Sequence, residues 1–152
     1  MQGKTPEAIL RAVAPCGLHC GACVAFAGGR ARQGAALLAE ALGENFAPYA
    51  ERFAAMQPAY ADYPAFRRLL EHIASGSCTG CRGSGCLFQA CRVPDCAKDH
   101  NVDFCFQCAA FPCVEHGFGP ELMRRWQKNN ERMRAIGVVA YHDFIKDKPR
   151  YP

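Results

Sequence analysis

Cysteine is the residue type whose number and spacing in this chain could do chemistry. Eleven of the 152 residues are cysteines, and they fall in three bursts in which neighbours are three to five positions apart. Such spacing brings several sulfurs within reach of one metal ion, because a tetrahedral zinc site takes four thiolates from short segments. We therefore predict that all eleven are metal ligands: Cys16, Cys20, Cys23, Cys78, Cys81, Cys86, Cys91, Cys96, Cys105, Cys108 and Cys113.

The second and third bursts each contain a CxxC pair, Cys78-Thr79-Gly80-Cys81 and Cys105-Phe106-Gln107-Cys108. This spacing lets two sulfurs chelate one tetrahedral ion while the amides between them point at the sulfurs. Zinc favours four thiolates in closed structural sites, and soft thiolates also suit iron–sulfur clusters. The spacing alone does not choose between them; we expect zinc as the cofactor, because the thiolate sets look closed and catalytic motifs are absent, and a [4Fe-4S] cluster is the alternative.

The first burst, Cys16-Gly17-Leu18-His19-Cys20-Gly21-Ala22-Cys23, has CxxxCxxC spacing. The same spacing holds the cluster of radical S-adenosylmethionine enzymes, but those enzymes surround it with most of a barrel, and this chain has a helical pattern. We expect one metal site on this burst with a distant fourth ligand, and one or two sites within residues 78–113. Eleven sulfurs divide into two sets of four and one set of three. The set of three could be completed as a metal site by water or by His19, His100 or His116, or its thiols could stay unliganded.

Disulfides are the main alternative to metal ligation, and they need an oxidising compartment. The segment from Met1 to Arg11 lacks the uninterrupted apolar core and small-residue cleavage site of a secretory signal. We therefore expect a cytoplasmic protein, whose thiols stay reduced. Thiolate ligation then explains the dense spacing better than cross-links or unpaired core cysteines do.

The rest of the composition excludes several classes of protein. No stretch approaches the roughly 20 apolar residues of a membrane span. The net charge of +4 is mild and its basic residues are scattered, so a nucleic-acid interface is not favoured. The sequence has no HExxH, no glycine-rich phosphate loop and no GxSxG, which argues against an enzyme. A protein partner stays open, and the oligomeric state is not specified.

Helices must position these cysteines, and apolar periodicity predicts six helices. They are expected over about residues 6–14, 35–42, 46–56, 62–74, 120–136 and 138–146, with Asn45 and Asp62 as N-caps and Gly43 and Gly137 as C-caps. Apolar residues recur every three or four positions in them, so we expect these side chains in the core: Phe46, Tyr49, Phe53, Met56, Phe66, Leu69, Leu70, Ile73, Leu122, Trp126, Met133 and Ile136.

Residues 78–113 follow neither helical nor strand periodicity, and only brief extensions such as 102–106 leave room for strand. Metal binding can order such a segment, because structural sites supply about 10 kcal/mol of folding energy. Arg82, Arg92 and Lys98 lie among its cysteines, where they could offset thiolate charge. We predict a mainly α fold: one small helical domain over residues 1–152, with helical parts at about 5–76 and 119–147 and an irregular cysteine-rich metal-binding segment at 78–113.

The order of these motifs resembles that of the prokaryotic family known as domain of unknown function 3795. The resemblance is carried by Pro15-Cys16-Gly17-Leu18-His19-Cys20-Gly21-Ala22-Cys23, Cys78-Thr79-Gly80-Cys81, the step from Cys91 to Cys96-Ala97, Cys105-Phe106-Gln107-Cys108 and Phe111-Pro112-Cys113. Residues 130–137 are similar to the family's helix near its C-terminal end. The resemblance implies a small metal-binding prokaryotic protein, and it implies no particular activity.

Overall fold

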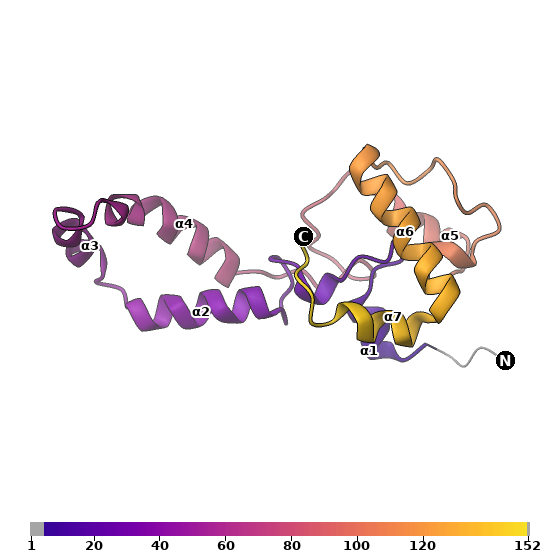
Figure 1. Cartoon of the computed structure of the whole chain (residues 1–152), viewed down its shortest axis with the longest axis horizontal. Helices are drawn as coiled ribbons and strands as arrows, with labels where there is room; N and C mark the ends of the chain where they lie inside the picture. The colour runs from indigo at the N-terminus through magenta and orange to yellow at the C-terminus, as the bar shows by residue number, and fades with distance from the viewer. Residues whose placement is uncertain (1–4, 152) are drawn as a thin grey trace.

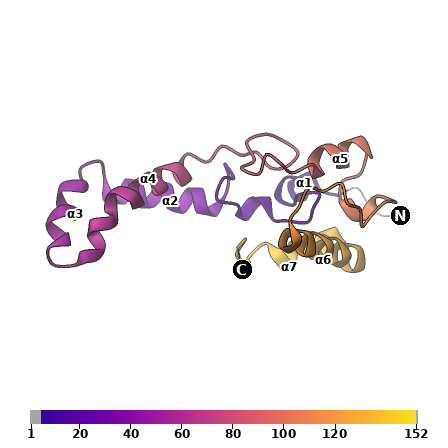
Figure 2. The same ribbon diagram turned by 90° about the horizontal axis from the view of Figure 1, so that it is seen from above.

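The computed structural model describes residues 5–151 as an elongated molecule with two parts (Figure 1). We call residues 30–74 the arm and the other described residues the body. The arm projects from the body, as the view from above also shows (Figure 2). Residues 1–4, on which part of the secretory-signal prediction falls, lie outside the described residues.

The body is built around α1 (Glu7–Ala12), α5 (Val93–Asp99), α6 (Pro120–Ile136) and α7 (Val138–Ile145). Pro120 begins α6 and Gly137 ends it with φ 83°, as predicted, because a residue without a side chain adopts this left-handed conformation without strain. Met133 and Trp126 are buried on the inner face of α6 as expected. Ile136 was expected there too, but it is 48% exposed at the helix end.

The arm consists of α2 (Arg30–Leu42), α3 (Ala47–Ala54), the 3₁₀ turn η2 (Pro58–Asp62) and α4 (Tyr63–Ala74). Helix α2 packs along α4, while α3 and η2 form the tip. Gly43 ends α2 as predicted. Asn45 is not the N-cap of α3, since Phe46 occupies that position; Asp62 does precede α4, but its side chain makes no capping hydrogen bond.

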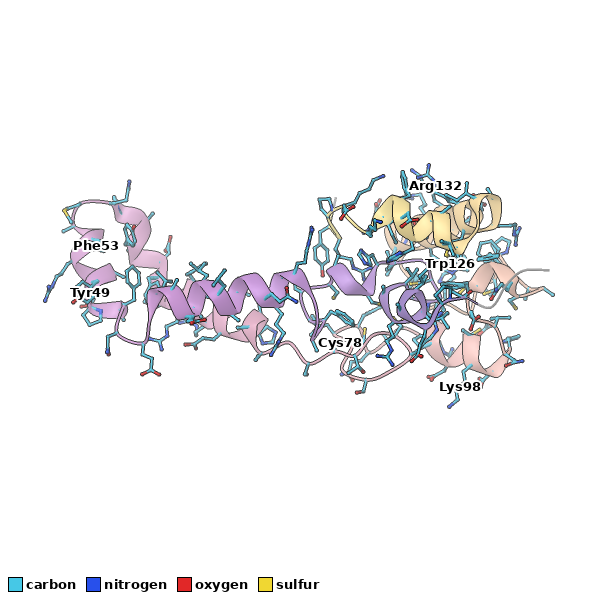
Figure 3. All side chains as sticks on the ribbon, turned by 90° about the horizontal axis from the view of Figure 1, so that it is seen from below. Tyr49, Phe53, Cys78, Lys98, Trp126 and Arg132 are labelled. Carbon is cyan, nitrogen blue, oxygen red and sulfur yellow. The ribbon has the colours of Figure 1, made fainter. Side chains whose placement is uncertain are left out.

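The predicted core of the arm is only partly correct. Leu70 is buried, together with Ala35, Ala50 and Tyr63. A single layer of two helices cannot enclose a whole apolar stripe, so several predicted core residues are exposed to solvent: Tyr49 53%, Met56 75%, Phe66 44% and Leu69 58%. Figure 3 places Tyr49 and Phe53 at the far end of the arm.

The mainly α prediction is confirmed, since residues 5–151 contain seven α-helices and their only β-pairings are two isolated bridges. The cysteine-rich segment is more ordered than predicted, because α5 lies inside it with Pro94 in the first turn, where proline's missing N–H needs no partner. The extension expected at 102–106 gives way to a 3₁₀ turn, η3 (Cys105–Gln107). None of the helices described is long and apolar enough to cross a membrane.

Candidate metal centres

Four of the predicted ligands line one small cavity in the body. Cys96 lies on α5. Cys105 begins the η3 turn, Cys108 directly follows it, and Cys113 lies five positions further along the chain. The cavity has a volume of about 20 Å³, and His100, Phe111 and Trp126 also line it. A space of this size takes one water-sized particle or ion. We call the thiols of Cys96, Cys105, Cys108 and Cys113 the four-thiol site.

Backbone groups and α6 hold the η3 turn in shape. Cys108 N donates to the Cys105 carbonyl at 3.0 Å, which closes the turn. Gln107 Oε1 accepts from the backbone N–H groups of Asp103 and Phe104, both at 2.9 Å. Asn130 on α6 is fully buried, and its Oδ1 accepts from Phe106 N at 2.9 Å. Helix α6 therefore helps to hold the turn that carries Cys105 and Cys108.

Burial in the four-thiol site raises the pKa of two of its thiols, those of Cys96 and Cys105, when no metal is bound. Burial raises the pKa of Cys105 to about 11, and the neighbouring Cys113, Cys96 and Cys108 add to the rise. Trp126 acts in the opposite sense and lowers that pKa, since its N–H lies where it would donate to the ionised sulfur. The buried Trp126 Nε1 has no partner within ordinary hydrogen-bond geometry among the described residues. A thiolate at Cys105 would give this N–H an acceptor.

The other seven cysteines form a second group, whose Cys78 lies where the arm meets the body (Figure 3). The Sγ atoms of Cys20 and Cys81 are 3.6 Å apart. Cys16 and Cys20 are buried in the core cluster of the body that also contains Trp126. Cys81 and Cys91 pack against this cluster, and so do Cys105 and Cys113 of the four-thiol site. We call these residues the seven-thiol group: Cys16, Cys20, Cys23, Cys78, Cys81, Cys86 and Cys91.

A β-bridge joins the first burst to the second. Cys78 N donates to the Ala25 carbonyl at 2.9 Å, and Ala27 N donates to the Cys78 carbonyl at 2.9 Å. Gly80 N donates to Cys78 Sγ at 3.3 Å, the amide-to-sulfur contact expected of a CxxC turn. Gly85, with φ 88°, passes so close to Cys78 that a Cβ there would lie 3.0 Å from the Cys78 Cα. The loop that carries Cys86 is therefore laid against Cys78.

Helices α6 and α7 hold the loop of the first burst. Gly17 has φ 80°, and its carbonyl accepts from Tyr141 Oη at 2.6 Å and from Asn129 Nδ2 at 3.3 Å. A Cβ at this position would lie 2.6 Å from the Asn129 Cβ, so only glycine fits. The turn after it, η1 (Cys20–Ala22), closes with a bond from Cys23 N to the Cys20 carbonyl, the pattern of η3.

The two turns are also similar in sequence, a signal that the spacing analysis missed. Cys20-Gly21-Ala22-Cys23-Val24-Ala25-Phe26 and Cys105-Phe106-Gln107-Cys108-Ala109-Ala110-Phe111 both read CxxCxAF. In each of them the phenylalanine N–H donates to the carbonyl of the second cysteine at 3.1 Å. The first burst thus contains a third CxxC turn of the same local structure.

Charges around the seven-thiol group are unevenly distributed. The hydrogen bond between Cys20 and Cys81 lowers the pKa of Cys20 to about 6 and raises the pKa of Cys81. Burial raises the pKa of Cys16 to about 12. Two guanidinium groups, those of Arg82 and Arg150, favour ionisation of Cys20. Arg82 was predicted to lie near the ligands, whereas Arg150 follows Pro149 near the end of the chain and carried no sequence signal.

Arg82 is held by backbone acceptors. Its Nη1 donates to the carbonyls of Leu10 and Val13, both at 2.6 Å, and its Nη2 donates to the Asp103 carbonyl. Its guanidinium also lies over the Phe104 ring, 5.1 Å from the centroid. The two other basic residues predicted to offset thiolate charge, Arg92 and Lys98, are exposed on α5 and its start.

The three candidate histidines occupy different environments. His100 lines the four-thiol site, with its Nδ1 3.7 Å from Cys96 Sγ and 2.9 Å from the Cys96 carbonyl. His116 is buried, and its Nδ1 accepts from Phe118 N at 2.9 Å. The buried His19 Nδ1 has no hydrogen-bond partner among the described residues, and burial lowers the pKa of the ring. Only His100 of the three lines a cavity together with the predicted thiols.

Within residues 5–151, no three His, Cys, Asp or Glu side chains converge tightly enough to hold a metal ion as they stand. The four-thiol site nonetheless fits such a group in two respects, its donor chemistry and the unpartnered Trp126 N–H beside Cys105. Binding would have to draw the sulfurs inward. The turns η1 and η3 supply the thiols in pairs that are already close in the chain.

Fold and site together define a small, mainly helical protein with two clusters of free thiols. Residues 12–117 match the family described as "Protein of unknown function (DUF3795)", and since this is well over half of the chain, the protein belongs to that family. The predicted membership is thus confirmed. Comparisons with curated proteins and with solved structures find no match.

Proposed function

We propose that this is a metal-binding protein in which cysteine thiolates hold structural zinc, and that the metal-supported body carries an interaction module. The observation that supports this best is the four-thiol site, where four cysteines line one cavity of about 20 Å³. Four thiolates are the ligand set of closed structural zinc sites. When bound, zinc would supply cross-linking energy and no redox chemistry.

The one short distance between two sulfurs agrees with zinc, and the pKa shifts determine how its binding depends on pH. Zn–S bonds of about 2.3 Å place two sulfurs of a tetrahedral site about 3.8 Å apart, close to the 3.6 Å between Cys20 and Cys81. The raised pKa values of Cys16 and Cys105 mean that zinc must displace protons from them, so binding weakens as the pH falls.

Metal analysis of protein purified without oxygen tests this proposal. We expect colourless protein with at least one zinc ion per chain, and a melting temperature that falls when a strong chelator is added. Cys108→Ser should lose one ion and melt earlier, while Ser77→Ala, an exposed substitution next to Cys78, should change neither quantity. Protein that contains no zinc after expression in zinc-supplemented medium would refute the proposal.

A [4Fe-4S] cluster is the second candidate cofactor, with electron transfer or redox sensing as the function. It is favoured by the seven-thiol group, which holds more sulfurs than one zinc ion takes and includes the CxxxCxxC burst. Anaerobic, iron-supplemented expression would then give brown protein whose visible absorption bleaches on reduction. Colourless, fully zinc-loaded protein from the same culture would exclude the cluster.

The arm is the surface that we assign to partner binding. It presents an apolar groove of about 420 Å³ whose lining is aliphatic and aromatic apart from one carboxylate, that of Asp62. The lining residues are Leu38, Leu42, Phe46, Ala59, Tyr60, Asp62, Tyr63 and Phe66. This favours a partner segment that is apolar and either neutral or basic.

A charge placed in the groove tests this surface. In affinity purification with tagged protein, Leu38→Glu should lose the proteins that wild type retains, because Leu38 is 41% exposed and lines the groove. Helix content should be unchanged. Glu40→Gln on the same helix is the control, and equal retention by wild type and Leu38→Glu would exclude the groove as the contact surface.

A further inference from the structure

A further cavity of the body is lined by basic side chains. Its volume is about 230 Å³, and it lies where the loop of the first burst meets α6, α7 and the residues after α7. We call it the basic pocket. Among the described residues that line it there is neither a cysteine nor a carboxylate, and its polar side chains are those of His19, Arg125, Asn129, Tyr141, Lys148 and Arg150.

The cations of the basic pocket are held in place by neutral groups. Arg125 Nη2 on α6 donates to the Arg150 carbonyl at 3.1 Å, which fastens the residues after α7 to this helix. Lys148 N donates to the Ile145 carbonyl at 3.0 Å and so extends the last turn of α7. The Lys148 ammonium lies over the Phe144 ring, 3.0 Å from its centroid, a contact that leaves its charge unneutralised.

The three cations, Arg125, Lys148 and Arg150, find no acidic partner among the described residues. None of the ion pairs there involves them. Arg125 and Arg150 are half-buried, and the buried Arg150 Nη1 has no hydrogen-bond partner in the part of the chain that the structure describes. Like charges around one hollow repel each other, and an unpaired buried donor costs free energy. An anion in the pocket would lower both costs.

Two other counter-charges lie near, but they leave most of this positive charge unpaired. The Arg150 guanidinium favours ionisation of the Cys20 thiol, so a thiolate can offset this one cation. Asp147 lies beside Lys148 in the chain, but it is exposed and does not line the pocket. Arg125 and Lys148 are therefore the cations that need an anion from outside the chain.

The size and charge of the pocket indicate which anion fits. Its volume is below the roughly 300–1,000 Å³ of pockets for drug-sized ligands, so the ligand is small. Guanidinium groups bind phosphate oxygens in pairs and an ammonium adds a point charge. Several cations together attract a doubly charged phosphate more strongly than a singly charged carboxylate.

We propose that the basic pocket binds the phosphate group of a small molecule, with Arg125, Lys148 and Arg150 as its cationic contacts. The ligand is either free phosphate or a phosphomonoester, whose organic part would lie against the apolar lining residues Leu18 and Ile145. This site adds a ligand to the proposed zinc-binding function and does not depend on the metal.

Isothermal titration calorimetry on the full chain as purified tests the site with two probes, inorganic phosphate and propyl phosphate, in chloride buffer of constant ionic strength. We expect one saturable site per chain. Affinity for inorganic phosphate that equals or exceeds that for propyl phosphate would identify free phosphate as the ligand. Tighter binding of propyl phosphate would identify a phosphomonoester.

Arg125→Gln and Lys148→Gln should each weaken binding about tenfold, since each removes a charged contact to the phosphate. Arg124→Gln and Lys146→Gln are the matched controls, because each removes the same charge from a nearby residue that already pairs with a carboxylate. They should leave the affinity nearly unchanged. The melting temperature of each variant checks its fold, and Lys148 is exposed, so its substitution tests the site even where Arg125→Gln disturbs α6.

Three results would overturn the proposal. They are the absence of saturable binding for both probes, acetate that binds as tightly as phosphate, and equal weakening by the controls and the pocket variants. A single-stranded oligonucleotide that binds more tightly than both probes would also overturn it, because the cations would then serve a nucleic-acid surface.

Discussion

Asn130 connects α6 to the four-thiol site, and its removal should weaken fold and metal binding together. Its side chain is fully buried, its Oδ1 accepts from Phe106 N at 2.9 Å and its Nδ2 donates to the Trp126 carbonyl at 3.0 Å. Asn130→Ala leaves the Phe106 N–H inside the protein without a partner. An unsatisfied buried donor costs about 1–3 kcal/mol, and the loss of the second hydrogen bond adds about 0.5–1 kcal/mol.

The expected loss is therefore about 1.5–4 kcal/mol in the free energy of unfolding of the zinc-loaded protein. For a chain of this length, that lowers the melting temperature by roughly 3–16 °C. Zinc affinity should fall as well, because the Cys105 to Cys108 turn loses the hydrogen bond that ties it to α6. Denaturant unfolding and competition with a chromophoric chelator measure the two effects.

Asn129→Ala is the matched control. Asn129 is the neighbouring asparagine, but its acceptor, the Gly17 carbonyl, keeps its 2.6 Å hydrogen bond from Tyr141. We expect this variant to lose less than about 1 kcal/mol. If Asn130→Ala were no less stable than Asn129→Ala, the argument that Asn130 positions the turn would be wrong.

Two further substitutions and one pH series follow from the same structure. Gly17→Ala should lower the free energy of unfolding by about 3 kcal/mol, since φ is 80° and the new Cβ lies 2.6 Å from the Asn129 Cβ. Gly34→Ala is the control, because nothing lies within 4 Å of its new Cβ. In thermal melts this control should be neutral or slightly stabilising. The fraction of metal-free protein whose body is still folded should fall further as the pH rises above 9, because the pKa of Cys16 lies at about 12 in the fold and at 9.0 unperturbed, and the loss is at most about 4 kcal/mol. Zinc-loaded protein should show the opposite trend and lose stability as the pH falls, since protons compete with the metal. Parallel trends in melting temperature with and without chelator would contradict this.

Helix positions could be predicted from the sequence because they depend on local patterns. Gly43 and Gly137 end their helices at positive φ, and apolar repeats place α4 and α6. The same repeats could not predict what covers an apolar face. Phe66 and Leu69 share a helix with buried Leu70, yet the arm offers no third layer to cover them.

The grouping of the cysteines depends on contacts between distant residues, so spacing could not predict it. Cys78 lies 55 positions after Cys23, and a β-bridge at Phe26 brings their segments together. Consecutive cysteines can also belong to different groups: Cys91 joins the seven-thiol group, and Cys96 lines the four-thiol site from the far side of the first turn of α5. Helix α5 begins between these two cysteines and carries Cys96, so their sulfurs belong to different groups although the spacing alone would pair them.

The separation of arm and body predicts that metal removal unfolds only part of the molecule. All eleven cysteines lie outside residues 30–74, while α2, α3 and α4 contain nearly half of the helical residues described. The arm has its own buried contacts at Ala35, Ala50, Tyr63 and Leu70, which do not involve thiols. Zinc should therefore stabilise the body and contribute little to the arm.

Trp126 makes this prediction measurable, because it is the only tryptophan and lies in the body against the four-thiol site. When a chelator is added to the full chain, tryptophan fluorescence should shift to that of an exposed indole, while up to about half of the far-ultraviolet helical signal persists and melts separately. Leu70 is one of the few buried residues of the arm, so Leu70→Ala should abolish the persistent helical signal and leave the fluorescence of the metal-loaded protein unchanged. If fluorescence and helical signal disappear in one transition, the arm depends on the metal centres and the two parts fold as a single unit.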